Sequence, residues 1–128
     1  MKKLLLSTSL IEFSLGIFLI LMPATVLSLL FGWEESGHII LLSRFTGIVF
    51  VCFGLACYPS NNPADENKIS MTFIAMFLYN FLAAVFLGYM KFGENFDGVL
   101  LLPAVILHSF ITIYFVYIFK NSKKLKQV

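Results

Sequence analysis

The sequence predicts an all-α integral membrane protein, a four-helix bundle with a short interfacial helix after the first span. Hydrophobic residues make up 59% of the 128 residues and charged residues only 12%. A soluble domain of this size could not cover so much apolar side chain with so little charge. The chain also contains four apolar runs, each close to the ~20 residues that a membrane helix needs. A chain of this length has room for one domain, so we expect residues 1–128 to form a single transmembrane unit.

The first membrane span is predicted over residues 4–21. Apolar character continues well beyond it, but one helix over the whole stretch would be longer than a hydrocarbon core of about 30 Å. Pro23 starts helices well and continues them badly, so we expect a break there and a short helix over 24–31, at the membrane surface or in the mouth of the bundle. The basic, leucine-rich start is also typical of a secretory signal, but Glu12 interrupts its apolar run. We therefore expect an uncleaved first helix.

Three further apolar runs predict the other spans, at residues 38–58, 69–90 and 98–119. The clearest loop is 59–68, whose prolines, asparagines and charges cannot lie in lipid. Gly47 and Gly54 are seven residues apart in the second span, which places them on one helix face with Arg44. We expect this face to let a neighbouring helix approach closely.

The lysines predict the orientation of the chain in the membrane. Lys2, Lys3, Lys68 and the basic tail 120–128 fall on one side, whereas the other side has Lys91 among several acids. Both termini should therefore be cytoplasmic. The tail lysines can hold anionic headgroups, so membrane lipids are expected partners. No basic stripe follows an exposed helix face, which argues against a nucleic-acid partner.

Each apolar run carries one strongly polar residue, namely Glu12, Arg44, Asn80 and His108. At about 1.5 Å per residue, Glu12, Asn80 and His108 lie at a similar depth, roughly 15 Å from the outer ends of their helices. Arg44 lies about 5 Å nearer the outside, a difference that an arginine side chain can span. Because a charge at a helix centre costs about 2.5–3.5 kcal/mol, we expect Glu12 and Arg44 to pair inside the bundle.

Small and hydroxylated residues surround the polar positions at helical spacing, as Ser9 does for Glu12 and Thr112 for His108. Such a pattern is typical of a helix–helix seam or a wet cavity. The candidate ligand-binding set is Glu12, Arg44, Asn80, His108, Ser9 and Thr112. Two interpretations remain open: the polar groups only satisfy one another, as structural pairs, or they line a functional cavity for a ligand, a proton or a headgroup.

Catalytic and metal motifs are absent from the sequence. It contains no nucleophile elbow, phosphate loop, HExxH or CxxC, so no catalytic residue is assigned. His38 begins a span and His108 lies in the middle of another, which is unlike a metal site, and no cofactor is indicated. Glu12, Asn80 and His108 have the chemistry for proton transfer on a lipophilic substrate, so the enzyme question stays open, with a non-enzymatic role favoured.

Two segments, GIFLILMPATVLSLLFG and SRFTGIVFVCFGL, resemble the DoxX-like group of small four-helix bacterial membrane proteins. The likeness covers the four-span plan, Pro23 after the first helix, and Arg44 with Gly47 and Gly54 in the second. It implies a bacterial inner-membrane location. Members of the group include subunits associated with membrane oxidoreductases and quinone chemistry.

The favoured function is binding of a lipophilic or amphipathic small molecule, lipid or quinone-like, by the polar centre. Arg44 would contact an anionic or carbonyl group of this molecule. One alternative is an oligomeric transporter or channel element, a homo-oligomer joined through the small-residue faces Gly47/Gly54 and Ala84/Gly88. The other is an accessory subunit of a membrane oxidoreductase.

Overall fold

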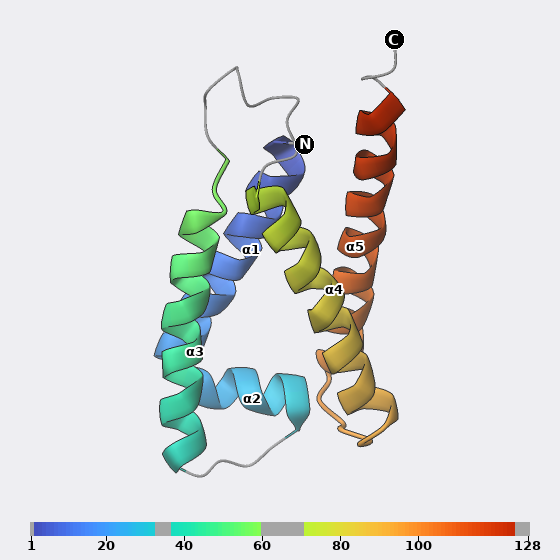
Figure 1. Cartoon of the computed structure of the whole chain (residues 1–128). Coiled ribbons are helices and arrows are strands. Elements are labelled where there is room, and N and C mark those ends of the chain that lie inside the picture. Colours follow the sequence, from blue (N-terminus) through green and yellow to red (C-terminus); the bar gives the residue numbers. More distant parts are fainter. Residues whose placement is uncertain (1, 33–36, 60–70, 125–128) are drawn as a thin grey trace.

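The computed structural model describes residues 2–32, 37–59 and 71–124, and these form helices joined by short turns, without any strand. The helices are α1 (Lys2–Leu21), α2 (Pro23–Phe31), α3 (Gly37–Ala56), α4 (Met71–Phe92) and α5 (Leu101–Lys124). In Figure 1 the long helices run alongside one another and α2 runs across the bundle near their ends.

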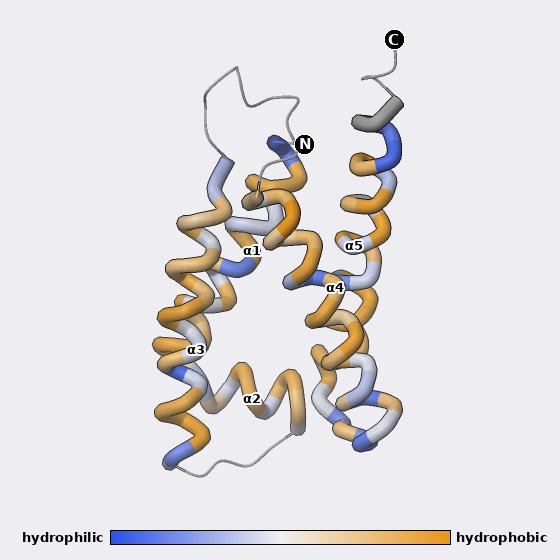
Figure 2. Tube along the Cα trace, in the orientation of Figure 1, coloured by the Kyte–Doolittle hydropathy of each residue, from blue (hydrophilic) through white to orange (hydrophobic). Residues whose placement is uncertain are grey.

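Four helices, α1, α3, α4 and α5, are each long and apolar enough to cross a membrane. Figure 2 shows them as mainly hydrophobic tubes with isolated hydrophilic positions part-way along their length. The protein is therefore a multi-pass, all-α membrane protein, and the predicted fold class is confirmed.

The short helix α2 begins at Pro23, where the missing backbone N–H of proline costs no hydrogen bond. It ends at Gly32, which adopts a left-handed φ of 73° and donates its N–H to the carbonyl of Ser28 at 2.8 Å. A left-handed residue at this position is the usual way to satisfy the last carbonyls of a helix. The chain thus turns sharply after α1, and α2 ends at Gly32.

The last helix begins later than the sequence predicted, at Leu101 instead of residue 98. The preceding residues bind α2: the Leu100 N–H donates to the Leu29 carbonyl at 2.8 Å. A Cβ on Gly98 would collide with the Leu30 carbonyl, so this close approach requires glycine. The helix continues to Lys124, so the first part of the predicted basic tail is helical. Residues 125–128 of that tail, and residues 69–70 of the predicted third span, lie outside the described residues.

The long helices form two pairs, α1 with α3 and α4 with α5 (Figure 1), and the pairs contact each other less extensively than the helices within each pair. Glycines make the α1–α3 seam close: a Cβ on Gly16 would lie 2.7 Å from the Gly47 carbonyl oxygen, and the reverse distance is also 2.7 Å. A Cβ on Gly54 would lie 2.8 Å from the Ser9 carbonyl oxygen. The predicted close approach at these glycines is confirmed, and α1 of the same chain is the neighbour.

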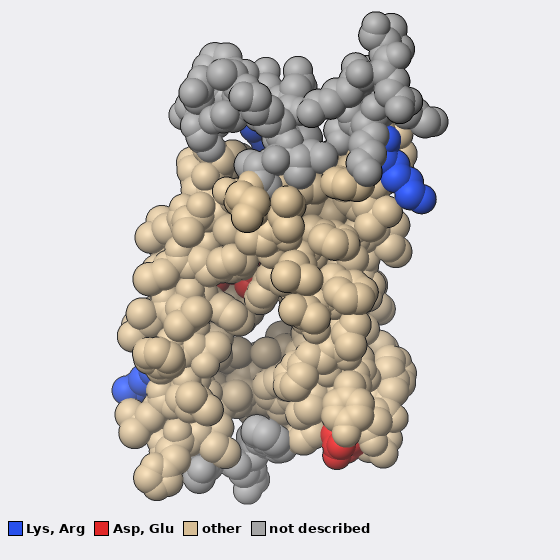
Figure 3. Space-filling model, viewed as in Figure 1, with Lys and Arg blue, Asp and Glu red and all other residues tan. Residues whose placement is uncertain are grey.

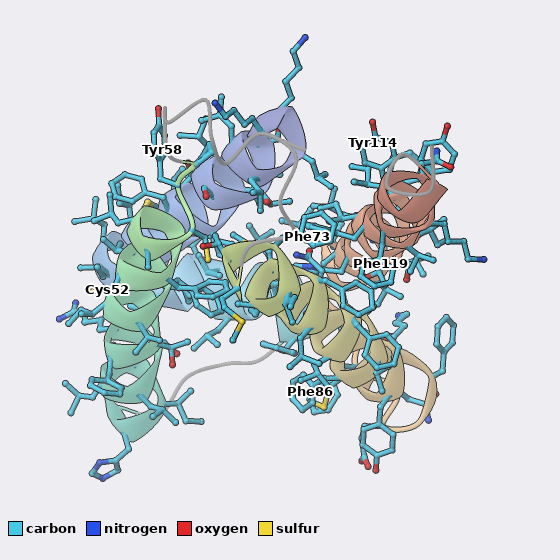
Figure 4. All side chains as sticks on the ribbon, turned by 45° about the horizontal axis from the view of Figure 1, so that its top comes forward. Cys52, Tyr58, Phe73, Phe86, Tyr114 and Phe119 are labelled. Carbon is cyan, nitrogen blue, oxygen red and sulfur yellow. The ribbon has the colours of Figure 1, made fainter. Side chains whose placement is uncertain are left out.

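An apolar core joins the two pairs near the N-terminal end of α1. Its buried members are Leu5, Cys57, Phe73, Met76, Ile111 and Phe115. The rings of Phe73 and Phe115 lie 4.7 Å apart between α4 and α5, whereas Phe86 and Cys52 point away from the bundle (Figure 4). Side chains therefore hold the pairs together at this end, and α2 spans between them at the other.

Candidate functional site

Arg44 does not meet Glu12, so the pairing predicted from the sequence is wrong. Its side chain is exposed, and it has no hydrogen-bond or ion-pair partner among the described residues. Figure 3 shows a basic side chain projecting from the α3 side of the molecule, and α3 contains no other Lys or Arg. Since Arg44 lies within the length of a membrane-crossing helix, its long apolar stem lets the guanidinium reach towards the nearer headgroups.

The glycine seam explains this orientation of Arg44. The buried positions of α3 are Ser43, Gly47 and Gly54, and these set the face that packs on α1. Each residue turns a helix by about 100°. Arg44 therefore lies about 60° from Gly47 and about 100° from Ser43, which places it at the edge of the seam and facing outward.

Glu12 is the acidic group at the centre of the molecule. It is only 1% exposed, and its Oε2 atom accepts a hydrogen bond of 2.7 Å from the hydroxyl of Tyr79 on α4. This is its one recorded partner among the described residues, and none of them pairs with its second carboxyl oxygen. The described parts of the membrane-crossing helices contain no other acidic residue.

Tyr79 connects the two helix pairs. Its hydroxyl binds α1 through Glu12, and its ring contacts Phe53 of α3 at a centroid distance of 5.1 Å and His108 of α5 at 5.8 Å. One side chain of α4 therefore touches all three of the other long helices. We did not single out Tyr79 from the sequence. A tyrosine near the middle of a span was the available signal, since a buried tyrosine hydroxyl usually requires a partner.

Asn80 and His108 meet each other, as their equal predicted depth suggested. Asn80 is 0% exposed and His108 is 7% exposed, and His108 Nδ1 lies 2.9 Å from Asn80 Oδ1. The Asn80 amide nitrogen donates to the Met76 carbonyl at 2.8 Å, so its oxygen is the atom that faces the imidazole. Nδ1 must then carry the proton and donate. In a neutral ring this leaves Nε2 as an acceptor, and no described residue pairs with it.

The two hydroxyl residues of the candidate set behave differently. Ser9 is 1% exposed, and its Oγ has no hydrogen-bond partner within the protein. It lies one turn before Glu12 on α1. The Thr112 hydroxyl donates to the His108 carbonyl at 2.7 Å, which occupies it within its own helix. The structure thus gathers Glu12, Ser9, Asn80 and His108 with Tyr79, and leaves out Arg44.

The surface is hollowed between the two helix pairs, on the α2 side of this polar centre (Figure 3). Acidic atoms are visible in the upper wall of the hollow. The view looks across the long helices, so the hollow opens towards the side of the bundle, where lipid would lie. The polar centre therefore borders a hollow that is open to the lipid side of the bundle.

The remaining described charges near the C-terminal end of α4 are satisfied locally. The Tyr89 hydroxyl donates to the carboxylate of Glu94, while Lys91 Nζ lies 3.4 Å from Asp97 Oδ1 and 3.0 Å from the Phe96 carbonyl oxygen. This loop therefore supplies no second candidate site. Likewise, the described residues contain no group of three or more His, Cys, Asp or Glu side chains that could hold a metal ion.

No protein-family model matches the chain, and neither the curated proteins nor the solved structures include a significant match to it. The resemblance to the DoxX-like group therefore stays a prediction.

Proposed function

We propose that the protein binds a small lipophilic or amphipathic molecule in the hollow between its helix pairs. The observation that carries the proposal is the Glu12 carboxyl, which is buried among apolar helices beside the hollow and paired only with a tyrosine hydroxyl. Ionisable groups inside membrane helices are expensive to bury and are usually functional. A role in structure alone would favour full mutual pairing of these groups. Here no residue that the structure describes pairs with the second Glu12 oxygen, His108 Nε2 or the Ser9 hydroxyl.

The free positions favour a ligand whose polar head donates hydrogen bonds. A Glu12 carboxylate oxygen and the Nε2 atom of a neutral His108 are both acceptors. Because Arg44 points outward, it supplies no cation for the anionic or carbonyl head that the sequence suggested. Amine and hydroxyl heads, including the hydroxyls of a reduced quinone, complement this site.

The rest of such a ligand would be apolar. The hollow opens to the side of the bundle (Figure 3), and many apolar side chains of the long helices are exposed there to lipid. Transfer of apolar surface out of water is favourable by about 25 cal/mol per Å², so a molecule of this kind concentrates in the bilayer before it binds. We therefore propose that the ligand partitions into the bilayer and enters the hollow from it.

The cellular setting is part of the proposal. The lysines favour cytoplasmic termini, and the DoxX-like resemblance favours a bacterial inner membrane. Reporter fusions to residue 128 test the orientation: a cytoplasmically active reporter such as a fluorescent protein should be functional there, and a periplasmically active phosphatase should not. Activity of the phosphatase alone would reverse the assignment of the two sides.

Native mass spectrometry of the detergent-solubilised protein tests the proposed binding. We expect a co-purifying lipophilic molecule to be retained by Arg44→Gln and lost from Glu12→Gln. Both variants replace one ionisable residue of a membrane helix by glutamine, so Arg44→Gln is the matched control. Equal occupancy in the two variants, or no bound molecule in the wild-type protein after incubation with a membrane lipid extract, contradicts the proposal.

A further inference from the structure

We infer that the ligand is an organic cation, a protonated amine on an apolar body, which binds in exchange for a proton on the Glu12 carboxyl. This inference rests on the proposed function and specifies its ligand class.

Glu12 has no cationic partner among the described residues. Its recorded contact is the neutral Tyr79 hydroxyl, Arg44 faces outward, and Lys91 binds Asp97 in the α4–α5 loop. A carboxylate without a cation is costly in an apolar medium, and either a proton or a bound cation removes that cost. The site is thus complementary in charge to an organic cation and not to an anion.

The hydrogen bonds point to the same class of ligand. An ammonium group has donors only. It can donate to the unpaired carboxylate oxygen of Glu12 and to the acceptor Nε2 of His108. A ligand acceptor in the same place would instead face these two acceptors without forming a hydrogen bond. The unpaired Ser9 hydroxyl, buried one turn away on α1, can turn its oxygen towards the same donor.

Aromatic rings gather beside the carboxyl. Phe50 and Phe53 of α3 pack on Tyr79 at centroid distances of 5.8 and 5.1 Å, and Tyr79 itself contacts Glu12. The faces of such rings attract cations, with a contribution that grows as water is excluded. An apolar wall with one acid and several rings favours a cation over a neutral molecule of equal shape.

Binding and proton release are coupled because both act on one carboxyl. When the ammonium enters, the Glu12 O–H bond breaks, the proton passes to water, and the net charge of the site stays unchanged. Among the described residues, the titratable groups that face Glu12 are Tyr79 of α4 and Cys57 just after α3, and the ring of His108 of α5 contacts the Tyr79 ring at a centroid distance of 5.8 Å. Of these, His108 alone normally changes charge between about pH 5 and 8, so the test must separate it from Glu12.

The test compares decylamine with decanol, which have the same chain and differ in charge. The protein is reconstituted in phosphatidylcholine nanodiscs, and dissociation constants are measured by equilibrium dialysis from about pH 5 to about pH 8, where the amine stays protonated. We expect decylamine to bind at least about tenfold more tightly than decanol at the upper pH. As the pH falls, the dissociation constant of decylamine should rise by up to about tenfold per pH unit, because protons compete with the amine for Glu12. The pH dependence of decanol binding reports the titration of His108. The ratio of the two dissociation constants therefore isolates the contribution of the charge on Glu12.

Two variants complete the test. In Glu12→Gln, which keeps an oxygen acceptor for Tyr79, the preference for the amine and its pH dependence should both disappear. Arg44→Gln should behave like the wild-type protein. Size-exclusion chromatography establishes that both variants are folded.

The outcomes separate this inference from the proposed function. If decylamine and decanol bind the wild-type protein equally and Glu12→Gln weakens the binding of both to the same extent, the cation assignment is overturned while binding in the hollow stands. If neither molecule binds the wild-type protein, both proposals fail. A last measurement uses nanodiscs that contain phosphatidylethanolamine. We expect this lipid not to displace decylamine, because its phosphate would accompany its ammonium group towards Glu12. Displacement of decylamine by the lipid would overturn the assignment to a free amine.

Discussion

Replacing Tyr79 by phenylalanine should weaken the connection between the two helix pairs without disturbing their packing. Phenylalanine keeps the ring that contacts Phe53 and His108 and removes only the hydroxyl that donates to Glu12. The lost interaction is therefore a single hydrogen bond between α1 and α4. A double-mutant cycle with Glu12→Leu isolates its energy, since leucine removes the acceptor.

The structure sets the expected size of this coupling. Hydrogen bonds between membrane helices average about 0.6 kcal/mol in such cycles and reach about 1.7 kcal/mol. The Tyr79–Glu12 bond belongs near the upper limit, because it is 2.7 Å long and Glu12 is 1% exposed, so water cannot replace the lost donor. We expect a coupling energy of about 1.5 kcal/mol.

Reversible unfolding in mixed micelles of dodecyl maltoside and SDS, followed by far-ultraviolet circular dichroism, measures each corner of the cycle. Tyr114→Phe is the matched control: Tyr114 is 44% exposed and stacks on Tyr117, so its loss of a hydroxyl should change the free energy of unfolding by less than about 0.5 kcal/mol. A coupling energy near zero for Tyr79 and Glu12, or an equal effect of the two tyrosine variants, would refute the view that this bond joins the helix pairs.

Two further substitutions test the seam and the second hydrogen-bonded pair. Gly47→Ala should lower the free energy of unfolding by about 1–3 kcal/mol, because its Cβ would lie 2.7 Å from the Gly16 carbonyl oxygen. Gly88→Ala, where nothing lies within 4 Å of the added Cβ, should be neutral or stabilising. Equal losses of unfolding free energy in the two variants, measured in the same assay, would count against the glycine seam. Asn80→Leu should cost about 1–3 kcal/mol, because the buried His108 Nδ1 then lacks its acceptor. The double variant Asn80→Leu/His108→Leu should recover part of this loss, and failure to recover any of it would argue against the contact.

The arrangement in pairs changes the assessment of the alternative functions. The Gly47/Gly54 face, which the sequence offered as a contact between copies, packs on α1 of the same chain and is not available to a second copy. The Ala84/Gly88 face remains for the homo-oligomer hypothesis, since nothing lies within 4 Å of a Cβ on Gly88. A stripe of small residues does not by itself identify a partner. The accessory-subunit hypothesis likewise stays a prediction.

The sequence by itself determined the membrane class, the approximate helix positions and the depth of the polar residues. Length and apolar composition are sufficient for the first two, because a bilayer imposes a nearly constant span. Depth follows from the constant rise of a helix, so the meeting of Asn80 with His108 could be predicted by counting residues. The burial of Glu12 followed from the cost of exposing a carboxyl to lipid.

Only the tertiary structure decided how each helix is rotated about its axis and which helices pair. Apart from Arg44, the second span carries only His38, Ser43 and Thr46 as polar side chains and is otherwise apolar on every side, so hydropathy gives it little preference for one face. Backbone contact at Gly16 and Gly47 sets its rotation, and that contact depends on the shapes of two helices at once. Arg44 consequently faces outward and Tyr79 becomes the partner of Glu12. The sequence determines which groups must be buried, whereas the packing of facing helices determines which partner each buried group contacts.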